Sequence, residues 1–302
     1  MASWQAHVLV FILKLRVKRK LKDVVDVDQA RKALITVKFA LPKGVLVEPG
    51  VIGGITGEWV RADGATSAQT LLYLHGGGYF VCSPETHRPI TAAFAKRGFR
   101  VFAPDYRLAP EHPFPAAVED AVAAYRGLVA SGIPAETITV AGDSAGGGLA
   151  LALLLSLRDA GDALPAAAML FSPWTDLAAT GASLVSNDAR DAMFHGDGIR
   201  RSTDVYLNGA DPRTPLASPL YADLHGLPPL MIHAGSYEVL LDDSTRLAEC
   251  ARKAGTPVEI RIWPVVPHVW QLFPWIPEAT ASMDEASRFL AAAGAGVRDL
   301  AA

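Results

Sequence analysis

The segment Gly142–Gly146 (GDSAG) holds a serine flanked on each side by a glycine two residues away. An apolar stretch precedes Ser144, and a long apolar stretch begins soon after it, at Gly148. This pattern predicts a strand, a sharp turn and a helix, in which glycines are needed where two backbones approach too closely for a Cβ atom. The turn would present the Ser144 hydroxyl at the helix N-terminus, where the dipole favours negative charge. Ser144 is therefore the expected nucleophile of an acyl transfer, and the alternative is a plain glycine turn that opens a helix.

A second glycine-rich segment, His75–Gly78 (HGGG), follows the apolar run Leu71–Leu74. Backbone N–H groups of such a loop, together with the N–H of Ala145, can stabilise the negative charge that develops on a substrate carbonyl oxygen. Each such donor is commonly worth about 3 kcal/mol of transition-state stabilisation. A phosphate-binding loop is the alternative. No Lys-Ser/Thr pair follows these glycines, however, and their spacing fits neither common phosphate-binding motif.

A nucleophilic serine needs a base, and His268 has the best position in the sequence. Where the nucleophile sits on a strand–turn–helix of this kind, the chain order is serine, acid, histidine. Four of the eight histidines precede Ser144, and three others fall in an irregular stretch, a loop and an expected strand. His268 follows the last apolar run and leaves room for an acid before it. The alternative is a buried histidine beside Trp270.

The acid is expected shortly after the apolar run Leu230–Ala234. Asp242 and Asp243 stand before a helical stretch, where capping of the helix explains them. Glu238 has no such explanation in its apolar surroundings, so it is the preferred candidate and Asp242 the reserve. The acid would hold one tautomer of the imidazole and stabilise the imidazolium without taking its proton.

Alternating strands and helices must position these residues. Strands are expected at 71–74, 100–105, 137–141, 166–171, 230–234 and 258–263, and helices at 117–129, 148–158, 247–253 and 281–292. This alternation implies right-handed crossovers and a mostly parallel sheet with helices on both faces. Residues 181–215 are polar and irregular, so we expect an insertion that joins the N-terminal helix as a lid.

The first forty residues are expected to be helical, with Trp4, Val8, Phe11 and Leu15 on one face. Basic residues follow densely, namely Lys14, Arg16, Lys18, Arg19, Lys20 and Lys22. We expect the apolar face to pack on the body of the protein and the charges to meet water. The alternative is a basic amphipathic helix that lies on a membrane surface.

The same N-terminal segment also indicates where in the cell the protein is expected. Its apolar run of six residues, 8–13, is shorter than the roughly 20 residues that a transmembrane helix needs. The positive charges follow this run instead of preceding it, so a secretory signal is not expected. We therefore expect a cytoplasmic protein.

Composition excludes several function classes. The chain has 302 residues, half of them hydrophobic, which suits a large core around one sheet. A net charge of −3 argues against a nucleic-acid-binding protein. The two cysteines, Cys82 and Cys250, are far apart, which suggests neither a disulfide framework nor a zinc site. We therefore expect no metal and no cofactor.

The sequence resembles the hormone-sensitive-lipase family of esterases from about residue 57 to 289. The segments that carry the resemblance are His75–Tyr79 (HGGGY), Asp105–Pro113 (DYRLAPEHP), Gly142–Gly147 (GDSAGG), Ser172–Asp176 (SPWTD) and Pro267–Trp270 (PHVW). The resemblance implies an α/β-hydrolase fold with a mostly parallel sheet. It also implies a serine carboxylesterase that cleaves short- to medium-chain esters through an acyl-enzyme, without a cofactor.

Residue by residue, the resemblance assigns Ser144 and His268 to the triad, and Gly76, Gly77 and Ala145 to the oxyanion hole. Many members have Asp-Pro-Leu at the position of the acid, whereas this chain has Glu238-Val239-Leu240. The family pattern further implies a cap made of residues 1–45 and an insertion near 181–215, with residues 46–302 as the catalytic domain.

Further expectations concern partners and supporting residues. The partner is a small-molecule ester and not nucleic acid, while a homodimer and a peripheral membrane contact stay open. A small-molecule receptor similar to the plant gibberellin receptor is the rival class, but such a receptor lacks the histidine that His268 supplies. We expect Asp105–Pro113 to support the glycine loop structurally, and Trp174 either to line the substrate pocket or to fill the core.

Overall fold

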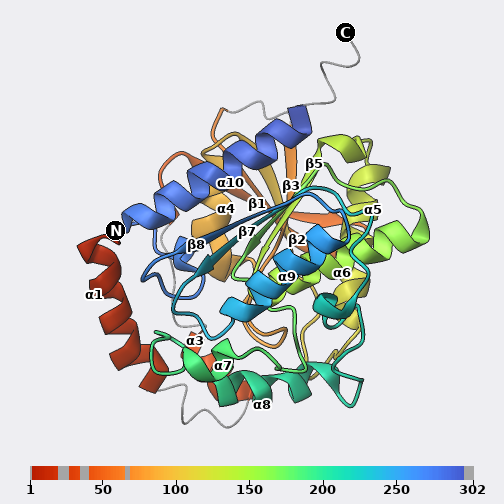
Figure 1. Ribbon diagram of the computed structural model, residues 1–302. Coiled ribbons are helices and arrows are strands. Elements are labelled where there is room, and N and C mark those ends of the chain that lie inside the picture. Colours follow the sequence, from red (N-terminus) through yellow and green to blue (C-terminus); the bar gives the residue numbers. More distant parts are fainter. Residues whose placement is uncertain (1, 20–26, 35–40, 65–68, 296–302) are drawn as a thin grey trace.

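The computed structural model describes residues 2–19, 27–34, 41–64 and 69–295, which fold around an eight-stranded sheet (Figure 1). Its strands are β1 (Val45–Ile52), β2 (Ile55–Ala62), β3 (Gln69–Leu74), β4 (Phe99–Pro104), β5 (Ile138–Asp143), β6 (Ala168–Phe171), β7 (Leu230–Gly235) and β8 (Val258–Trp263). They lie in the order β1-β2-β4-β3-β5-β6-β7-β8. β2 is antiparallel to both β1 and β4, and every other neighbouring pair is parallel.

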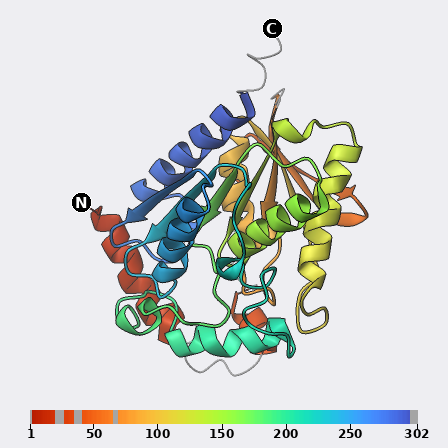
Figure 2. The same cartoon turned by 45° about the vertical axis from the view of Figure 1, so that its right-hand side comes forward.

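Helices cover both faces of the sheet (Figure 2). One face carries α5 (Ala116–Ala130), α6 (Ala145–Ala160) and α9 (Leu241–Lys253), and the other carries α4 (Arg88–Ala95) and α10 (Pro277–Ala295). Successive side chains of a strand point to opposite faces, so β3 places Leu72 in the first core and Tyr73 in the second. The two cores hold the sheet between its helical layers.

All six expected strands and all four expected helices are present, and the expected mostly parallel sheet with helices on both faces is confirmed. The sequence did not indicate β1, β2 or α4. The hairpin of β1 and β2 is half-exposed and contains Pro49 and Gly50, so it lacks the continuous apolar run that marks a buried strand.

The expectation of an irregular segment at 181–215 is wrong in part, because it contains α7 (Ser183–Ser186) and α8 (Gly196–Leu207). Ile199, Tyr206 and Leu207 of α8 are buried and join the larger core. The rest of α8 is strongly polar, which hides these few apolar positions in the sequence.

The N-terminal segment forms α1 (Trp4–Leu13), the π-helical continuation η1 (Lys14–Lys18) and α3 (Val27–Leu34), while Lys20 and Lys22 lie outside the described residues. The expected packing face of α1 is wrong. Its buried residues are Ala6, Leu9, Val10 and Leu13, and the last three contribute to a third apolar cluster with Trp263 and Trp270. Because α1 is apolar on nearly every side, helical spacing alone does not select the buried face.

None of the helices in the described part of the chain combines the length and apolar character needed to cross a bilayer.

Candidate active site

Ser144 lies in the sharp turn between β5 and α6, with φ 53° and ψ −123°. A positive φ is uncommon for a residue with a side chain and stores strain in the turn. A Cβ on Gly142 would lie 2.2 Å from the Gly146 carbonyl oxygen, and one on Gly146 would lie 2.0 Å from the Leu74 oxygen. The predicted strand–turn–helix is therefore confirmed, together with the need for glycine at both positions.

Backbone hydrogen bonds hold the turn in this conformation. The Ser144 N–H donates to the Phe171 oxygen over 2.8 Å, which ties the turn to the end of β6. The Ser144 oxygen accepts from Gly147 N (3.0 Å) and Trp174 N (2.9 Å). The half-buried Ser144 side chain makes no capping hydrogen bond to α6, so the turn presents the hydroxyl without using it.

His268 and Glu238 form a buried pair, with 2.6 Å between Nδ1 and Oε2. The other carboxylate oxygen, Oε1, accepts from Gly235 N (2.5 Å) and from the Ser172 hydroxyl (2.7 Å). These two donors, at the ends of β7 and β6, orient the carboxylate toward the imidazole. His268 Nε2 is buried and has no hydrogen-bond partner within the described chain. One nitrogen of the ring is thus fixed, and the other is available for proton transfer.

The surroundings of His268 set its protonation. Burial lowers the pKa of His268, but the charge and hydrogen bond of Glu238 raise it, with smaller contributions from Asp191 and Asp143. The net effect is a pKa above the ordinary value of 6.5. The pair therefore stabilises an imidazolium, which is the state that a general base enters when it accepts a proton.

Neither the reserve candidate Asp242 nor the neighbouring Asp243 bonds to the histidine. Both Asp242 and Asp243 lie in the first turn of α9, whose N-cap is Leu240, so the capping explanation is wrong for both. Asp242 Oδ2 accepts from Ser183 N (2.9 Å) in the insertion. Asp243 Oδ2 accepts from the amides of Thr175 and Asp176, both over 2.8 Å. Through these hydrogen bonds the two aspartates hold the neighbouring loops in place.

The structure differs from the expectation that Gly76 is an oxyanion donor. The N–H of Gly76 donates to Asp143 Oδ1 over 3.1 Å and is therefore occupied. Within the described residues, the amides of Gly77, Gly78 and Ala145 have no acceptor. Gly77 and Gly78 have φ values of 117° and 61°, which turn the backbone of the loop after Gly76. The geometry leaves Gly77, Gly78 and Ala145 as available donors.

Buried aromatic side chains support this loop. The Tyr106 hydroxyl donates to the His75 oxygen over 2.6 Å, and the two rings stack at 4.3 Å. The Ala109 amide donates to the Tyr79 oxygen over 2.9 Å. The expected structural role of Asp105–Pro113 is thus confirmed. Trp174 is 2% exposed and belongs to the larger core, as the core-filling alternative expects.

Three supporting residues were missed by sequence reasoning. Ser172, which orients Glu238, lies in the family segment SPWTD, but nothing in the sequence indicates this role. Asp191 of the insertion accepts from Val239 N (2.8 Å), next to the acid, and from Phe194 N (2.8 Å). The Phe194 ring then packs edge-on against His268 with centroids 5.1 Å apart. No sequence signal identified Asp191 or Phe194, because their roles depend on contacts with distant segments.

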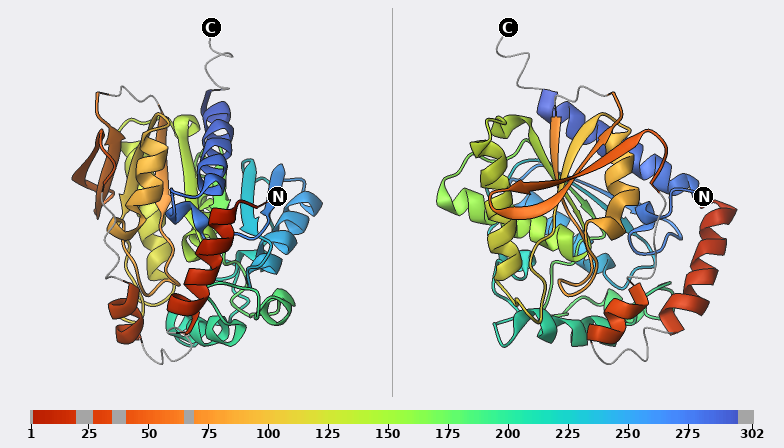
Figure 3. Two further views of the ribbon diagram at one scale, coloured as in Figure 1. Left: turned by 90° about the vertical axis from the view of Figure 1, so that its left-hand side faces the viewer. Right: turned by 180° about the vertical axis from the view of Figure 1, so that it is seen from behind.

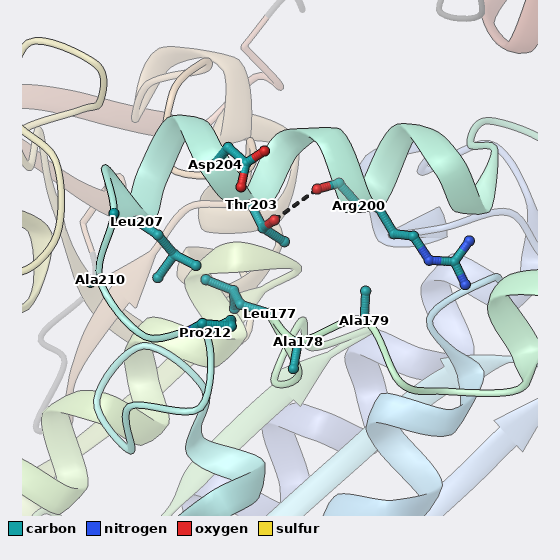
Figure 4. Close-up of a pocket in the computed structure, with 10 residues that line it drawn as sticks. Leu177, Ala178, Ala179, Arg200, Thr203, Asp204, Leu207, Ala210 and Pro212 are labelled. Carbon is teal, nitrogen blue, oxygen red and sulfur yellow. Dashed lines mark hydrogen bonds between the residues drawn. The ribbon is translucent and has the colours of Figure 1, made fainter.

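A hollow of about 300 Å³ lies between α8 and the loop after β6 (Figure 4). Its lining residues are Leu177, Ala178, Ala179, Arg200, Thr203, Asp204, Leu207, Gly209, Ala210 and Pro212. Ser144, His268 and Glu238 are not among them. This hollow is thus lined by residues other than the three expected to carry out catalysis.

Known proteins resemble this chain over most of its length. A family model described as alpha/beta hydrolase fold matches residues 71–272. An acetyl-hydrolase of Streptomyces hygroscopicus is 48% identical over 274 residues, which cover 90% of each chain. An esterase of Acinetobacter venetianus is 36% identical over 81% of this chain and 82% of its own.

Solved esterase structures also resemble this chain over nearly its whole length. A crystal structure of EstE5 soaked with ethyl alcohol superposes with a TM-score of 0.94 at 41% identity, and the match covers 98% of this chain and all of that one. An esterase of the bacterial hormone-sensitive lipase family superposes with a TM-score of 0.90, also at 41% identity, over 96% of this chain and 98% of its own.

Proposed function

We propose that this chain, which belongs to the hormone-sensitive-lipase-like alpha/beta hydrolases and hydrolyses carboxylic esters, does so with Ser144, His268 and Glu238 as its triad. The observation that carries the assignment is the oriented pair of His268 and Glu238, with one imidazole nitrogen bonded and the other without a partner. Ser144 adds a strained turn that exposes its hydroxyl at the start of α6. The esterase relatives exclude the receptor interpretation for this chain.

The reaction proceeds in two acyl-transfer steps. His268 Nε2 takes the proton of Ser144 Oγ as this oxygen attacks the ester carbonyl carbon, and the resulting oxyanion accepts from Gly77, Gly78 and Ala145. The imidazolium then returns its proton to the departing alkoxide, which leaves an acyl group on Ser144. Water repeats the sequence, and the carboxylic acid is released.

A cap over this site is also part of the proposal. Residues 1–45 and the insertion near 181–215 would form it above the catalytic domain, residues 46–302. In support, α3, α7 and α8 lie at one end of the molecule, and α1 runs along its side toward that end (Figure 1). Lys14 Nζ donates to the Ala189 oxygen (3.0 Å), and Arg31 Nε donates to the Phe80 oxygen (2.8 Å) just after the glycine loop. Phe194 of the insertion packs on His268.

The preferred substrates are short- to medium-chain acyl esters. The Streptomyces relative is named an acetyl-hydrolase, which favours the short end of this range. A series of p-nitrophenyl esters from acetate to palmitate tests this part, and kcat/KM should fall beyond medium chain lengths. A maximum at palmitate would contradict it.

The protein is further proposed to be cytoplasmic and to form a homodimer. A cytoplasmic location agrees with two free cysteines, as is usual in a reducing compartment. A homodimer agrees with the outer edge of β8, which pairs with no other described strand. Light scattering coupled to gel filtration measures the second point directly.

The triad itself is tested by Ser144→Ala, with Ser131→Ala as a matched control on the exposed end of α5. We expect Ser144→Ala to abolish hydrolysis of p-nitrophenyl butyrate and labelling by a fluorophosphonate probe, while Ser131→Ala retains both. Unchanged turnover in Ser144→Ala would exclude this serine as the nucleophile.

A further inference from the structure

Helix α1 and its continuation η1 expose the apolar face that the sequence suggested would be buried. Trp4 is 71% exposed, Phe11 63%, Leu15 48% and Val8 41%. Their spacing of three and four residues places them along one side of the helical segment, and Figure 3 shows α1 on the outside of the molecule. Exposed apolar side chains are ordinary one at a time, but a contiguous row that includes two aromatic rings indicates an interaction surface.

The orientation of α1 is fixed by contacts at both ends. At the start, the Ser3 side chain accepts from Ala6 N (3.1 Å), and Ser3 N and Oγ donate to the Glu278 carboxylate (2.6 and 2.9 Å). At the other end, Lys18 Nζ donates to the backbone oxygens of Asp188 and Asp191. Since Leu9 and Leu13 are buried on the inner side, rotation of α1 to hide its outer face would expose them.

The charge of this segment has one sign. Exposed Arg16 and Arg19 follow the apolar face, and no acidic residue occurs before Asp23 in the sequence. A further indole, that of Trp275, is 54% exposed, and the next residue, Ile276, packs in the cluster beneath α1. The outer side of α1 thus combines tryptophan and phenylalanine side chains with cations.

We propose that the outer face of α1 and η1, formed by Trp4, Val8, Phe11 and Leu15 with Arg16 and the following Arg19, docks on an anionic lipid surface. Helices that lie in a membrane interface have this combination, because apolar and aromatic groups enter the boundary of the acyl chains while cations meet lipid phosphates. A lipid surface is favoured over a second copy of the chain, since this face carries no acidic side chain to pair with the arginines of a copy.

Docking at α1 would bring the lipid surface close to the catalytic end of the molecule. Lys18 bonds to the Asp191 backbone, and the Asp191 side chain supports the loop that holds Glu238. Membrane-associated esters would therefore be concentrated near the cap.

The experiment is co-sedimentation of the full chain with vesicles of phosphatidylcholine alone or with 30% phosphatidylserine, a proportion of about one lipid in three chosen to give a strongly negative surface. We expect binding to the anionic vesicles and little to the neutral ones. The variant W4S/F11S should weaken binding at least ~10-fold, because it removes the two large exposed aromatic side chains that would enter the lipid boundary. Val51→Ser, which alters an exposed apolar residue on β1 at the far edge of the sheet, should bind like the parent.

A second pair of variants tests how much the two arginines contribute to binding. R16Q/R19Q should weaken anionic binding about 5-fold per arginine. The control K96Q/R252Q changes the net charge equally at exposed positions outside this face and should have a much smaller effect. Turnover of water-soluble p-nitrophenyl acetate, expected to remain within about twofold in all variants, shows that each protein is folded.

Three outcomes would overturn the proposal. The first is equal sedimentation of parent and W4S/F11S. The second is binding that does not depend on phosphatidylserine. The third is a dimer of the parent chain that W4S/F11S dissolves while neither protein binds vesicles, because the face would then belong to a second copy.

Discussion

The backbone N–H of Gly76 donates to Oδ1 of Asp143, the residue directly before the proposed nucleophile, over 3.1 Å. The same carboxylate is buried and accepts from the Tyr73 hydroxyl (2.5 Å), and its Oδ2 lies 3.2 Å from His87 Nε2. Asp143 thus links the glycine loop to the turn that carries Ser144. Because the Gly76 N–H bonds to Asp143, it holds the loop in place and cannot donate to the oxyanion. In the proposed reaction, the loop amides that bind the oxyanion are therefore those of Gly77 and Gly78.

Asp143→Ala removes the acceptor of Gly76 and leaves buried donors unpaired. We expect kcat for p-nitrophenyl acetate to fall about 100-fold, because a shift of the loop by about 1 Å misplaces the oxyanion donors. Asp143→Asn keeps Oδ1 as an acceptor and should retain most activity. Rates are normalised to the fraction labelled by a fluorophosphonate. A normal rate per labelled molecule in Asp143→Ala would show that the link serves stability alone.

Glu238→Gln separates the preferred acid from the reserve. The amide that replaces Oε2 donates toward His268 Nδ1 and favours the wrong tautomer, so kcat should fall on the order of 10³- to 10⁴-fold in a folded protein. Asp242→Asn, which alters a carboxylate bonded to Ser183 N, should stay within about twofold of the parent. The reverse pattern in steady-state kinetics would transfer the role to Asp242.

The pH profile of kcat/KM reports His268 in the free enzyme. The base must be neutral, and Glu238 raises the pKa of His268 above 6.5, so activity should rise with a midpoint above pH 6.5. A raised pKa also means that protonated His268 stabilises the fold fully below pH 6.5, and that this stabilisation is lost as pH rises through the folded-state pKa. In Glu238→Gln the midpoint of the residual activity should move to lower pH. An unmoved midpoint would contradict the pairing.

Asp243 gives a prediction for stability. Burial raises the pKa of this carboxyl from 3.8 to about 7, despite the two amides that donate to it. The folded state then keeps a proton that the unfolded state releases, so this group stabilises the fold fully below pH 3.8 and loses that contribution as pH rises through about 7.

Asp243→Asn stays neutral and can still accept from both amides. Urea unfolding should show it gaining stability relative to the parent between pH 4 and pH 8, whereas the exposed Asp197→Asn should show no such trend. Parallel pH dependences for the parent and Asp243→Asn would refute the raised pKa.

Local features of the sequence were sufficient for the central fold. The run before Gly142 and the run after Gly148 define a strand and a helix by their own hydrophobicity, and two glycines define the turn between them, so Ser144 could be placed without knowledge of distant contacts. The same holds for the parallel sheet, because buried strands are continuous apolar runs. The positions of His268 and Glu238 after β8 and β7 followed from chain order.

Tertiary structure decided what depends on direction and on partners far away in the chain. A backbone N–H has no sequence signature, so only the fold shows that Gly76 bonds to Asp143 across 67 residues. Helix α1 is apolar on nearly all sides, and Trp263 and Trp270 determine which side is covered. Ser172 and Phe194 meet Glu238 and His268 only when separate loops converge. Hydrophobic pattern specifies which segments are buried, whereas the contacts that orient a particular atom arise when those segments pack together.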